Sequence, residues 1–186
     1  ARPAVHESDV DAAAQGAVAP FGADSGAESE AGANPENPYT LQQELQQTMN
    51  DLVGIIRRAE EMEQALKKLD ELRRRAQHIV VEGHRQFNPG WHLALDLRNM
   101  LVVSECVTRA ALERTESRGG HTREDYPDMD SDWRHVVLAC TQDGSSGAVD
   151  VERKEQLPMR PDLLELFDLD ELKKYFTAEE LPGGTD

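Results

Sequence analysis

The stretch AEEMEQALKKLDELRRRAQHI, residues 59–79, decides the fold. Its apolar residues recur at steps of three and four, the spacing that places side chains on one face of an α-helix. The opposite face is charged and includes Glu63 and Lys67, which are four residues apart and support a helix as an ion pair. The pattern predicts an amphipathic helix with a single apolar stripe, formed by Met62, Leu66, Leu69, Leu72, Ala76 and Ile79.

Two further helical patterns flank this stretch. The first is expected to start at Thr40 as its N-cap, and Gly54 marks an end or a kink. The second runs from about Trp91 to Ser117, where Gly119 and Gly120 supply a helix stop. Each stripe alone would leave apolar surface in water, so the three helices predict an antiparallel up-down-up bundle. The inward residues are Leu41, Leu45, Met49, Leu52, Val53 and Ile56 in the first helix, and Leu93, Leu97, Met100, Leu101, Ser104, Val107 and Ala111 in the last.

The hydrophobic period changes after the third helix. WRHVVLACTQ (133–142) and AVDVERKEQL (148–157) are typical of strands and flank the turn DGSSG. A short β-hairpin is expected, and it must lie on the bundle because a two-stranded ribbon is marginal by itself. The tail from Arg160 is apolar enough for one or two short amphipathic helices, which either dock on the same protein or bind a partner. Its apolar residues are Leu163, Leu164, Phe167, Leu172, Tyr175 and Phe176.

These patterns predict a mainly α fold with three parts. Residues 1–38 are expected to form an acidic Ala/Gly-rich linker that includes a short helix capped by Ser8. Residues 39–157 form the three-helix bundle and the β-hairpin, and residues 158–186 form an acidic amphipathic tail. Because the chain begins at Ala1 rather than Met, we expect a piece of a longer protein.

The net charge of -16 is concentrated at the two ends of the chain. Residues 1–38 carry seven acids against one base and residues 161–186 carry eight against two, whereas residues 39–160 are nearly balanced. An acidic chain without a basic stripe is not expected to bind nucleic acid. The sequence contains neither a run of 18 apolar residues nor a signal peptide, so neither a membrane span nor export is predicted from it. Cys106 and Cys140 are expected to be buried free thiols of a reducing cytoplasm.

The stretch ERTESRGGHTREDYPDMD, residues 113–130, raises the question of a chemical site. Aligned as an EF-hand, the acidic run from Asp128 fails, because Trp133 replaces the required Gly and Ala139 replaces the required Glu. The histidines lack the spacing of a metal site, and neither HExxH nor Cys-x-x-Cys is present. A nucleophile and base pair of Ser117 and His121 lacks a nucleophile elbow.

An ion-paired joint fits this stretch better than an active site or a cation site. Arg114, Arg118 and Arg123 carry fork-shaped donors suited to the neighbouring carboxylates. Gly119 and Gly120 permit positive φ angles and a close approach of backbones. Since glycine-rich phosphate-binding motifs are absent as well, no catalytic, cofactor-binding or metal-binding residue is predicted in this chain.

The same stretch carries a resemblance to a known family. RNMLVVSECVTRAALERTESRGGHTREDYPDMDSDWRHVVLAC resembles the C-terminal region of succinate dehydrogenase and fumarate reductase flavoprotein subunits, through the pattern R-x-E-S-R-G-x-H-x-R-x-D-x-P. LQQTMNDLVGIIRRAEEMEQALKKLDELRRR is similar to the helical region of that family, and the resemblance covers about residues 1–157. L-aspartate oxidase is a close relative with a similar segment, and the Leu-Gln-Gln-rich first helix and the DW-RHV hairpin favour succinate dehydrogenase or fumarate reductase.

The resemblance implies a parent flavoprotein that binds FAD and interconverts succinate and fumarate, passing electrons to an iron–sulfur subunit and a quinone. The flavin and substrate residues of the family lie upstream of this region, so the chain alone is expected to bind no cofactor and to be inactive. Its implied partners are the FAD and capping domains and the iron–sulfur subunit, on the inner face of the bacterial membrane. The alternative is a free-standing acidic helical adaptor. The expected domain-docking residues are Arg114, Glu116, Ser117, Arg118, Gly119, Gly120, His121, Arg123, Asp125 and Pro127.

Overall fold

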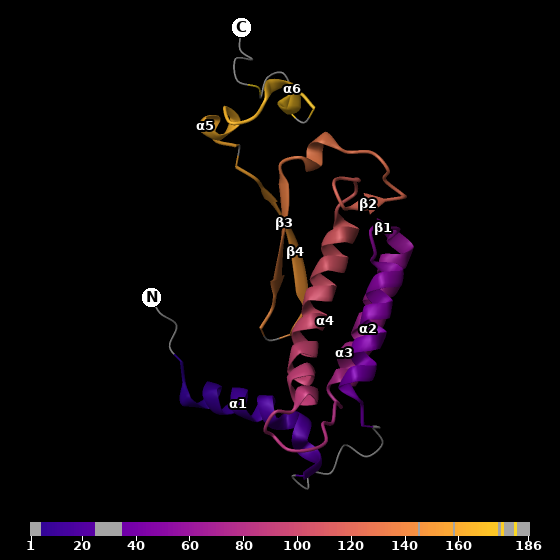
Figure 1. The fold of residues 1–186 in the computed structure, drawn as a ribbon, viewed down its shortest axis with the longest axis vertical. Coiled ribbons are helices and arrows are strands. Elements are labelled where there is room, and N and C mark those ends of the chain that lie inside the picture. The colour runs from indigo at the N-terminus through magenta and orange to yellow at the C-terminus, as the bar shows by residue number, and fades with distance from the viewer. Residues whose placement is uncertain are drawn as a thin grey trace.

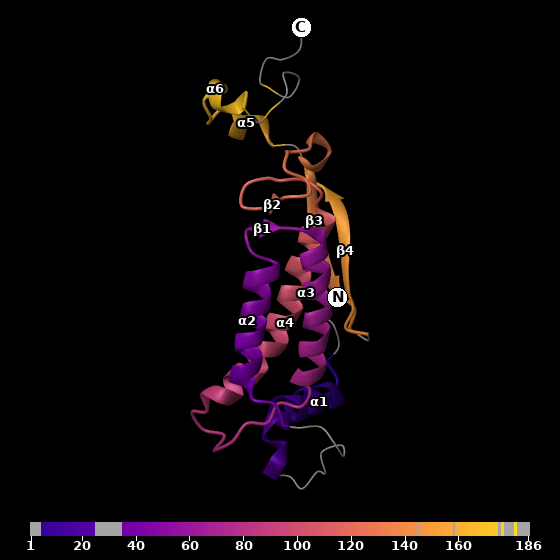
Figure 2. The ribbon, with the colours of Figure 1, turned by 90° about the vertical axis from the view of Figure 1, so that its right-hand side faces the viewer.

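The protein is an elongated, mainly helical molecule in the computed structural model (Figure 1). The structure describes residues 5–24, 35–144, 146–157, 159–174, 176 and 181. Helices α2, α3 and α4 pack pairwise along the long axis, α1 lies across one end of them, and a β-hairpin lies along α4 (Figures 1 and 2). The helices are α1 (Glu7–Val18), α2 (Pro38–Leu52), α3 (Ala59–Ala76), α4 (Pro89–Glu113), α5 (Pro161–Leu164) and α6 (Leu169–Leu172), with 3-10 helices η1 (Ala19–Asp24) and η2 (Ser131–Trp133).

Two of the long helices begin with the same Asn-Pro signal. The side chain of Asn37 accepts a hydrogen bond from the backbone N–H of Tyr39 at 2.9 Å, and Asn88 accepts one from Trp91 at 3.1 Å. The following proline in each case occupies the first turn, where its missing N–H costs nothing. The prediction of Thr40 as the N-cap of the first helix was therefore wrong, because Asn37 provides the stronger start signal three residues earlier.

The core is built from the predicted stripes of α2, α3 and α4. Leu69 and Leu72 of the opening stretch are 2% and 4% exposed, and Met62 is fully buried. Ala65 takes the place expected for Leu66, which is only half-buried, because the small side chain allows closer packing of the helices. The buried cluster consists of Phe21, Leu41, Leu45, Leu69, Leu72, Ile79, Val81, Ala94, Leu97 and Leu101.

The end of α1 and the helix η1 pack on the base of this core. Phe21 is buried, and its ring lies 5.5 Å from the ring of Trp91. The Trp91 indole donates a hydrogen bond to the carbonyl of Ala17 at 2.7 Å. The short helix is present, but the prediction of Ser8 as its N-cap was wrong: it begins at Glu7, and its N-cap is His6, whose amide donates a hydrogen bond to Asp9. The later part of the predicted linker, residues 25–34, lies outside the described residues.

Strands connect the helix ends at the opposite end of the molecule. The strands β1 (Ile56–Arg57) and β2 (Thr122–Arg123) form a short parallel pair, which joins the turn after α2 to the segment after α4. The sequence patterns did not predict this pair. It places the C-terminal ends of α2 and α4 at the same end of the molecule, where α3 begins (Figure 2).

The predicted hairpin is confirmed by β3 (Val136–Gln142) and β4 (Val149–Glu155), which pair antiparallel with Val136 opposite Glu155. The first strand begins three residues later than expected, because Trp133 belongs to η2 and is buried. Beyond the hairpin, α5 and α6 form a small cap at the end of the molecule (Figure 1), which agrees with the expected short tail helices. Tyr175, one of the apolar residues expected in the tail, lies outside the described residues.

Among the described residues, no helix is both long enough and apolar enough to cross a membrane.

Candidate functional site

The segment Arg114–Pro127 forms a compact arm that leaves the end of α4 and turns back towards the start of α3. We call it the motif arm. Helix α4 ends at Glu113, four residues before the predicted end, because Arg114 adopts an extended conformation with φ -78° and ψ 105°. Arg118 and His121 then exchange two backbone hydrogen bonds around Gly119–Gly120. The φ angle of Gly119 is +59°, which glycine adopts without strain. The glycines therefore form the exposed tip of the arm rather than a helix stop.

Glu116 is the buried anion of the motif arm. Its side chain has no exposed surface, and its carboxylate accepts hydrogen bonds from Arg114 at 2.6 Å, from Arg118 at 2.9 Å and from the amide of Asp130 at 3.0 Å. Burial favours the protonated acid, but the hydrogen bonds from Arg118, Asp130 and Arg114 outweigh it and lower the pKa of Glu116 to about 2. The carboxylate therefore remains charged at neutral pH and holds both arginines in place.

Arg114 links the motif arm to the hairpin. Its guanidinium donates to the carbonyl of Val136 at 2.7 Å, where β3 begins, and lies 4.9 Å from the centre of the Trp133 ring. Arg153 of β4 stacks on the same ring at 4.2 Å, and the Trp133 indole donates to the hydroxyl of Thr115. The buried tryptophan between two guanidinium groups thus fixes the hairpin relative to the arm.

Arg123 is the buried cation of the motif arm and is 1% exposed. Its Nη1 atom donates to the carbonyl oxygens of Ala111, Leu112 and Arg114 at 2.9–3.0 Å. These carbonyls lie at the C-terminal end of α4, where they have no partner in the next turn and where the helix dipole favours a positive charge. Arg123 therefore caps the longest helix from a position 12 residues beyond Ala111.

Asp125 completes the link to the third helix. Its two carboxylate oxygens accept hydrogen bonds from Nε and Nη2 of Arg123, both at 2.7 Å, and one also accepts from the amide of Ala59 at 3.2 Å. The paired hydrogen bonds from Arg123 lower the pKa of Asp125 to about 2. Ala59 is the first residue of α3. The Arg123–Asp125 pair therefore provides hydrogen-bond partners both for carbonyl groups at the end of α4 and for an amide at the start of α3.

His121 is held as a neutral imidazole. Its Nδ1 lies 2.7 Å from Nη1 of Arg57, and its Nε2 lies 3.2 Å from the carbonyl oxygen of Arg114. A guanidinium can only donate, so Nδ1 accepts and the proton is on Nε2. Burial, reinforced by the charges of Arg57 and its neighbours, lowers the pKa of His121. Both ring nitrogens are therefore occupied by structural hydrogen bonds.

The hydroxyl of Ser117 forms hydrogen bonds to the backbone of the turn. It forms none with His121, so the two residues are not arranged as a nucleophile and its general base. The hydroxyl accepts from the amide of Arg123 at 2.8 Å and lies 2.7 Å from the carbonyl of Tyr126, to which it donates. Both contacts stay within the arm. Pro127, between Tyr126 and Asp128, is exposed. All ten predicted docking residues thus lie in one arm, whose charged groups are paired inside the chain.

A second buried charge was missed by sequence reasoning. Glu105 in α4 is 5% exposed and pairs with Arg73 of α3 and with Arg109 one turn later. The apolar stripe of α4 was expected to continue through Val107, but Val107 is exposed and Thr108 is buried instead. The i,i+4 spacing of Glu105 and Arg109 was the only signal of this cluster in the sequence.

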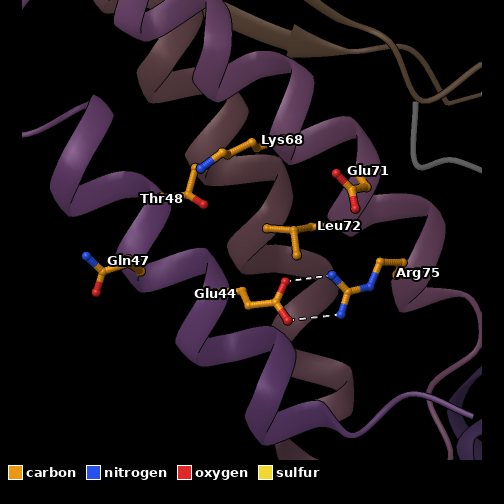
Figure 3. Close-up of a pocket in the computed structure, with 7 residues that line it drawn as sticks. All are labelled: Glu44, Gln47, Thr48, Lys68, Glu71, Leu72 and Arg75. Atoms are coloured by element: carbon orange, nitrogen blue, oxygen red, sulfur yellow. Dashed lines mark hydrogen bonds and ion pairs between the residues drawn. The ribbon is translucent and has the colours of Figure 1, made fainter.

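The groove between α2 and α3 is also lined by paired charges. Arg75 donates to Glu44 at 2.6 and 3.0 Å (Figure 3) and to Glu36, just before α2, at 2.7 and 3.1 Å. These hydrogen bonds raise the pKa of Arg75 further. The pocket has a volume of about 220 Å³ and is lined by Glu44, Gln47, Thr48, Lys68, Glu71, Leu72 and Arg75.

The two cysteines lie at the seam between α4 and the hairpin. The Cys140 thiol is 3.7 Å from the carbonyl oxygen of Cys106, and both side chains are half-buried free thiols rather than fully buried ones. Burial, followed by the neighbouring Cys140, raises the pKa of Cys106. This shift favours the unreactive thiol form.

Neither a metal site nor a flavin site emerges from the described residues. Among them, no group of three or more His, Cys, Asp or Glu side chains could hold a metal ion. A flavin dinucleotide needs a glycine-rich turn at the start of a helix for its pyrophosphate, and the sequence contains no such motif.

The comparison with protein families identifies the fold and the motif arm together. Residues 42–163, two thirds of the chain, match the family model described as "Fumarate reductase flavoprotein C-term". The chain belongs to this family. The match includes most of α2, all of α3 and α4, the motif arm and the hairpin, and it ends within α5. The resemblance drawn from the motif is thereby confirmed.

Several curated relatives carry the names expected for this flavoprotein family. The fumarate reductase flavoprotein subunit of Helicobacter pylori is 35% identical over 122 residues, which are 64% of this chain and 17% of that protein. The succinate dehydrogenase flavoprotein subunit of Coxiella burnetii is 38% identical over 107 residues, 56% of this chain and 18% of its own length. L-aspartate oxidase of Yersinia pestis is 40% identical over 95 residues, 51% of this chain and 17% of that protein. The chain thus spans less than a fifth of each of these relatives.

The solved structures agree with this family assignment. A chain of the Mycobacterium smegmatis Sdh1 complex is 56% identical, with a TM-score of 0.79 over 97% of this chain and 30% of that one. A chain of Escherichia coli quinol fumarate reductase is 24% identical, with a TM-score of 0.65 over 86% of this chain and 27% of that one. The second comparison supports the fold alone, whereas the first supports the fold and the family.

Proposed function

We propose that this chain is the C-terminal helical domain of a succinate dehydrogenase or fumarate reductase flavoprotein, and that it has a docking and structural role. The observation that carries the proposal is the match of residues 42–163 to the flavoprotein C-terminal family, since this match contains the complete motif arm. The chain covers only 17–18% of the flavoprotein subunits it matches, which leaves room for the FAD-binding and capping domains elsewhere in the polypeptide.

The motif arm is the surface that we assign to docking on those domains. Its charges are paired within the chain, so the arm can meet another domain without leaving a charge unpaired. Its outer side presents Gly119 and Gly120 with open space around them, and Tyr126 of the arm and Met129, two residues beyond it, are 43% and 61% exposed. An arm with a small tip and exposed apolar side chains suits a fixed contact between domains.

The reaction of the parent protein would be the interconversion of succinate and fumarate. FAD bound by the upstream domains would exchange the electrons, which would pass through an iron–sulfur subunit to a quinone. In this role the chain holds the flavin domain in place and contributes to the contact with the iron–sulfur subunit. The complete protein would lie on the inner face of the bacterial membrane through its partner subunits.

The substitution Arg118→Ala in the full-length flavoprotein tests the docking role. Arg118 holds Glu116 with three hydrogen bonds, and its loss frees the tip of the arm. We expect a lower flavin content or weaker assembly of the purified enzyme before any change in substrate affinity. Arg58→Ala is the matched control, because Arg58 forms an exposed ion pair with Glu124 beside the arm. Unchanged flavin content together with a raised KM would count against the docking role.

L-aspartate oxidase is the second candidate for the parent protein, because the L-aspartate oxidase of Yersinia pestis is 40% identical to this chain over 95 residues. Assaying the full-length protein with succinate and with L-aspartate, using the same artificial electron acceptor, distinguishes the two. The encoding reading frame separates both from a free-standing adaptor. An in-frame FAD-binding region upstream removes the adaptor, and a native start codon at Ala1 supports it.

A further inference from the structure

The C-terminal part of the chain, from just before α5, is only partly included in the family match. We define the tail segment as residues 159–174, which contain α5 and α6. The family model ends at residue 163, so most of this segment lies outside the part that the family shares. The match to the Mycobacterium smegmatis chain covers 97% of this chain. The 23 residues beyond the family match are a larger share than the remaining 3%, so most of them are included in that match. Most of the tail segment therefore has a counterpart in that chain.

The tail segment is folded, and one ring contact just beyond it joins it to the rest of the molecule. Leu164 and Leu172 are 9% and 4% exposed, so each short helix buries one leucine. The guanidinium of Arg134, which follows η2, lies 4.6 Å from the centre of the Phe176 ring. Asp168 caps α6 by accepting a hydrogen bond from the amide of Asp170 at 2.8 Å. These contacts fix which side chains the segment presents outward.

The outward side of the tail segment is apolar. Leu166 is 77% exposed, and Leu163, Phe167 and Leu169 are each between 42% and 54% exposed. Phe167 and Leu169 line a shallow depression together with Leu164. Large apolar side chains exposed within a few residues of one another, instead of scattered singly, mark a site of interaction. The segment lies at the end of the molecule beyond the hairpin (Figures 1 and 2), away from the core that α2, α3 and α4 share.

The rim of this surface is acidic. The cations of the tail segment are occupied by carboxylates of the same segment: Lys173 pairs with Asp170 at 2.8 Å, Lys174 with Glu171 at 2.6 Å and Arg160 with Asp162 at 2.6 Å. Glu165 and Asp168, which flank Leu166 and Phe167, form no ion pair within the described part of the chain. The apolar side chains are therefore bordered by two carboxylates that form no close ion pair in this part of the chain, although the charge of Asp168 also acts on Lys173.

We propose that the surface formed by Leu163, Leu166, Phe167 and Leu169 binds a groove on another protein whose floor is apolar and whose rim carries lysine or arginine. Charge complementarity selects this occupant, because Glu165 and Asp168 lack cations that a basic rim would supply. A second copy of this chain would bring another acidic tail and a net charge of -16 against the first. An anionic lipid surface would be repelled in the same way. This binding surface goes beyond the docking role of the motif arm and does not depend on it.

Site-specific photo-crosslinking in the full-length protein tests the surface. A photoreactive benzoylphenylalanine is placed at Leu166, the protein is expressed in the cells from which the gene comes, and adducts are mapped by mass spectrometry. Val103, which is 60% exposed on α4, provides the matched control position. We expect Leu166 to give an adduct with a second protein at a peptide that contains basic and apolar residues, and Val103 not to give that adduct.

Two variants, measured for adduct yield at Leu166, separate the contributions of charge and apolar surface. Glu165→Gln with Asp168→Asn removes both free carboxylates, and asparagine retains the cap of α6. We expect this double variant to lower the yield about tenfold, the effect of 1.4 kcal/mol of lost attraction, and Phe167→Asp to abolish the adduct. The proposal is overturned by an adduct with lipid, with a second copy or with the same polypeptide, by no adduct, or by a yield that the double variant leaves unchanged.

Discussion

The motif arm and the tail segment are both rich in charge, but they use it in opposite ways. In the motif arm the carboxylate of Glu116 is fully buried, and three donors, including Arg114 and Arg118, point at it. In the tail segment the ion pairs are exposed and join residues within one helical turn, as Lys173 and Asp170 do. The apolar residues show the opposite distribution: Trp133 beside the arm is buried, and Leu166 of the tail is 77% exposed.

A high density of charged residues in the sequence therefore does not by itself indicate a catalytic or binding site. Buried, multiply hydrogen-bonded charges cost several kcal/mol when one partner is removed, whereas exposed pairs contribute ~0–1 kcal/mol. The arm should therefore govern the stability of the domain, and the tail segment should be neutral for stability and available for binding. Four predictions test this division, beginning with the largest effect.

Arg123→Met should be the most damaging single change. It removes the donor of three carbonyls at the end of α4 and leaves Asp125 without its paired partner. We expect the free energy of unfolding in urea to fall by about 3–5 kcal/mol, the cost of breaking a buried ion pair. Arg58→Ala is the control from the exposed pair with Glu124 and should lower the free energy of unfolding far less than Arg123→Met does. Equal losses in the two variants would remove the distinction between buried and exposed pairs.

The pH dependence of stability should report the charge of Glu116. Its pKa in the folded protein is about 2, below its ordinary value of 4.5, so its stabilising effect is present above pH 4.5 and is lost as the pH falls towards 2. The full effect is about 3 kcal/mol, and Asp125 adds to it in the same direction. Chemical denaturation of the wild type and of Glu116→Gln between pH 5 and 2 checks this. A wild-type curve no steeper than that of the variant would contradict it.

Glu105→Gln tests whether a buried carboxylate outside the motif arm stabilises the domain as much as the charges of the arm do. The partners of Glu105 are Arg73 and Arg109, whose side chains are 33% and 42% exposed, so they can turn to water when the charge is lost. We expect a loss of about 1.5–3 kcal/mol, the usual worth of hydrogen bonds to a charged group, which is less than for Arg123→Met. Thermal and urea unfolding measure it. A loss as large as that of Arg123→Met would mean that the three carbonyls at the end of α4 that Arg123 also holds add nothing to the effect of its ion pair.

Leu166→Ser should have the smallest effect. The side chain is 77% exposed, so its removal creates no cavity and should change the free energy of unfolding by less than about 0.5 kcal/mol. Leu172→Ala in the same segment is the control, because Leu172 is buried and its loss should disturb α6. A large loss from Leu166→Ser would show that the tail segment is part of the core, and the comparison with the arm would fail.

Much of the fold follows from hydrophobic period and from turn residues. The stripes through Leu41, Leu69 and Leu97 place three helices correctly, and the change of period at Val136 places the hairpin, because these signals are local. The motif in Arg114–Pro127 likewise identified the family. The conclusion that calcium and nucleophile patterns fail there also follows from local spacing, before any contact is known.

The contacts within the site could not be predicted, because they join residues that are distant in the sequence. Arg57 meets His121 across 64 residues, and Asp125 meets the amide of Ala59 across 66. The end of α4 was misplaced for the same reason, since its cap is the side chain of Arg123 rather than a local glycine. Glu105 was missed because its burial depends on Arg73, which is distant in the sequence. The hydrophobic period alone predicts that a charged residue such as Glu105 faces solvent.

The central claim is that this chain stabilises a flavoprotein without carrying its chemistry. The most direct test is to express residues 1–186, confirm folding by circular dichroism, incubate the chain with FAD, and measure bound flavin and succinate oxidation with an artificial electron acceptor. We predict a cooperatively folded chain with no retained flavin and no turnover. Stoichiometric flavin, or turnover above the level of a Glu116→Ala control, would contradict the claim.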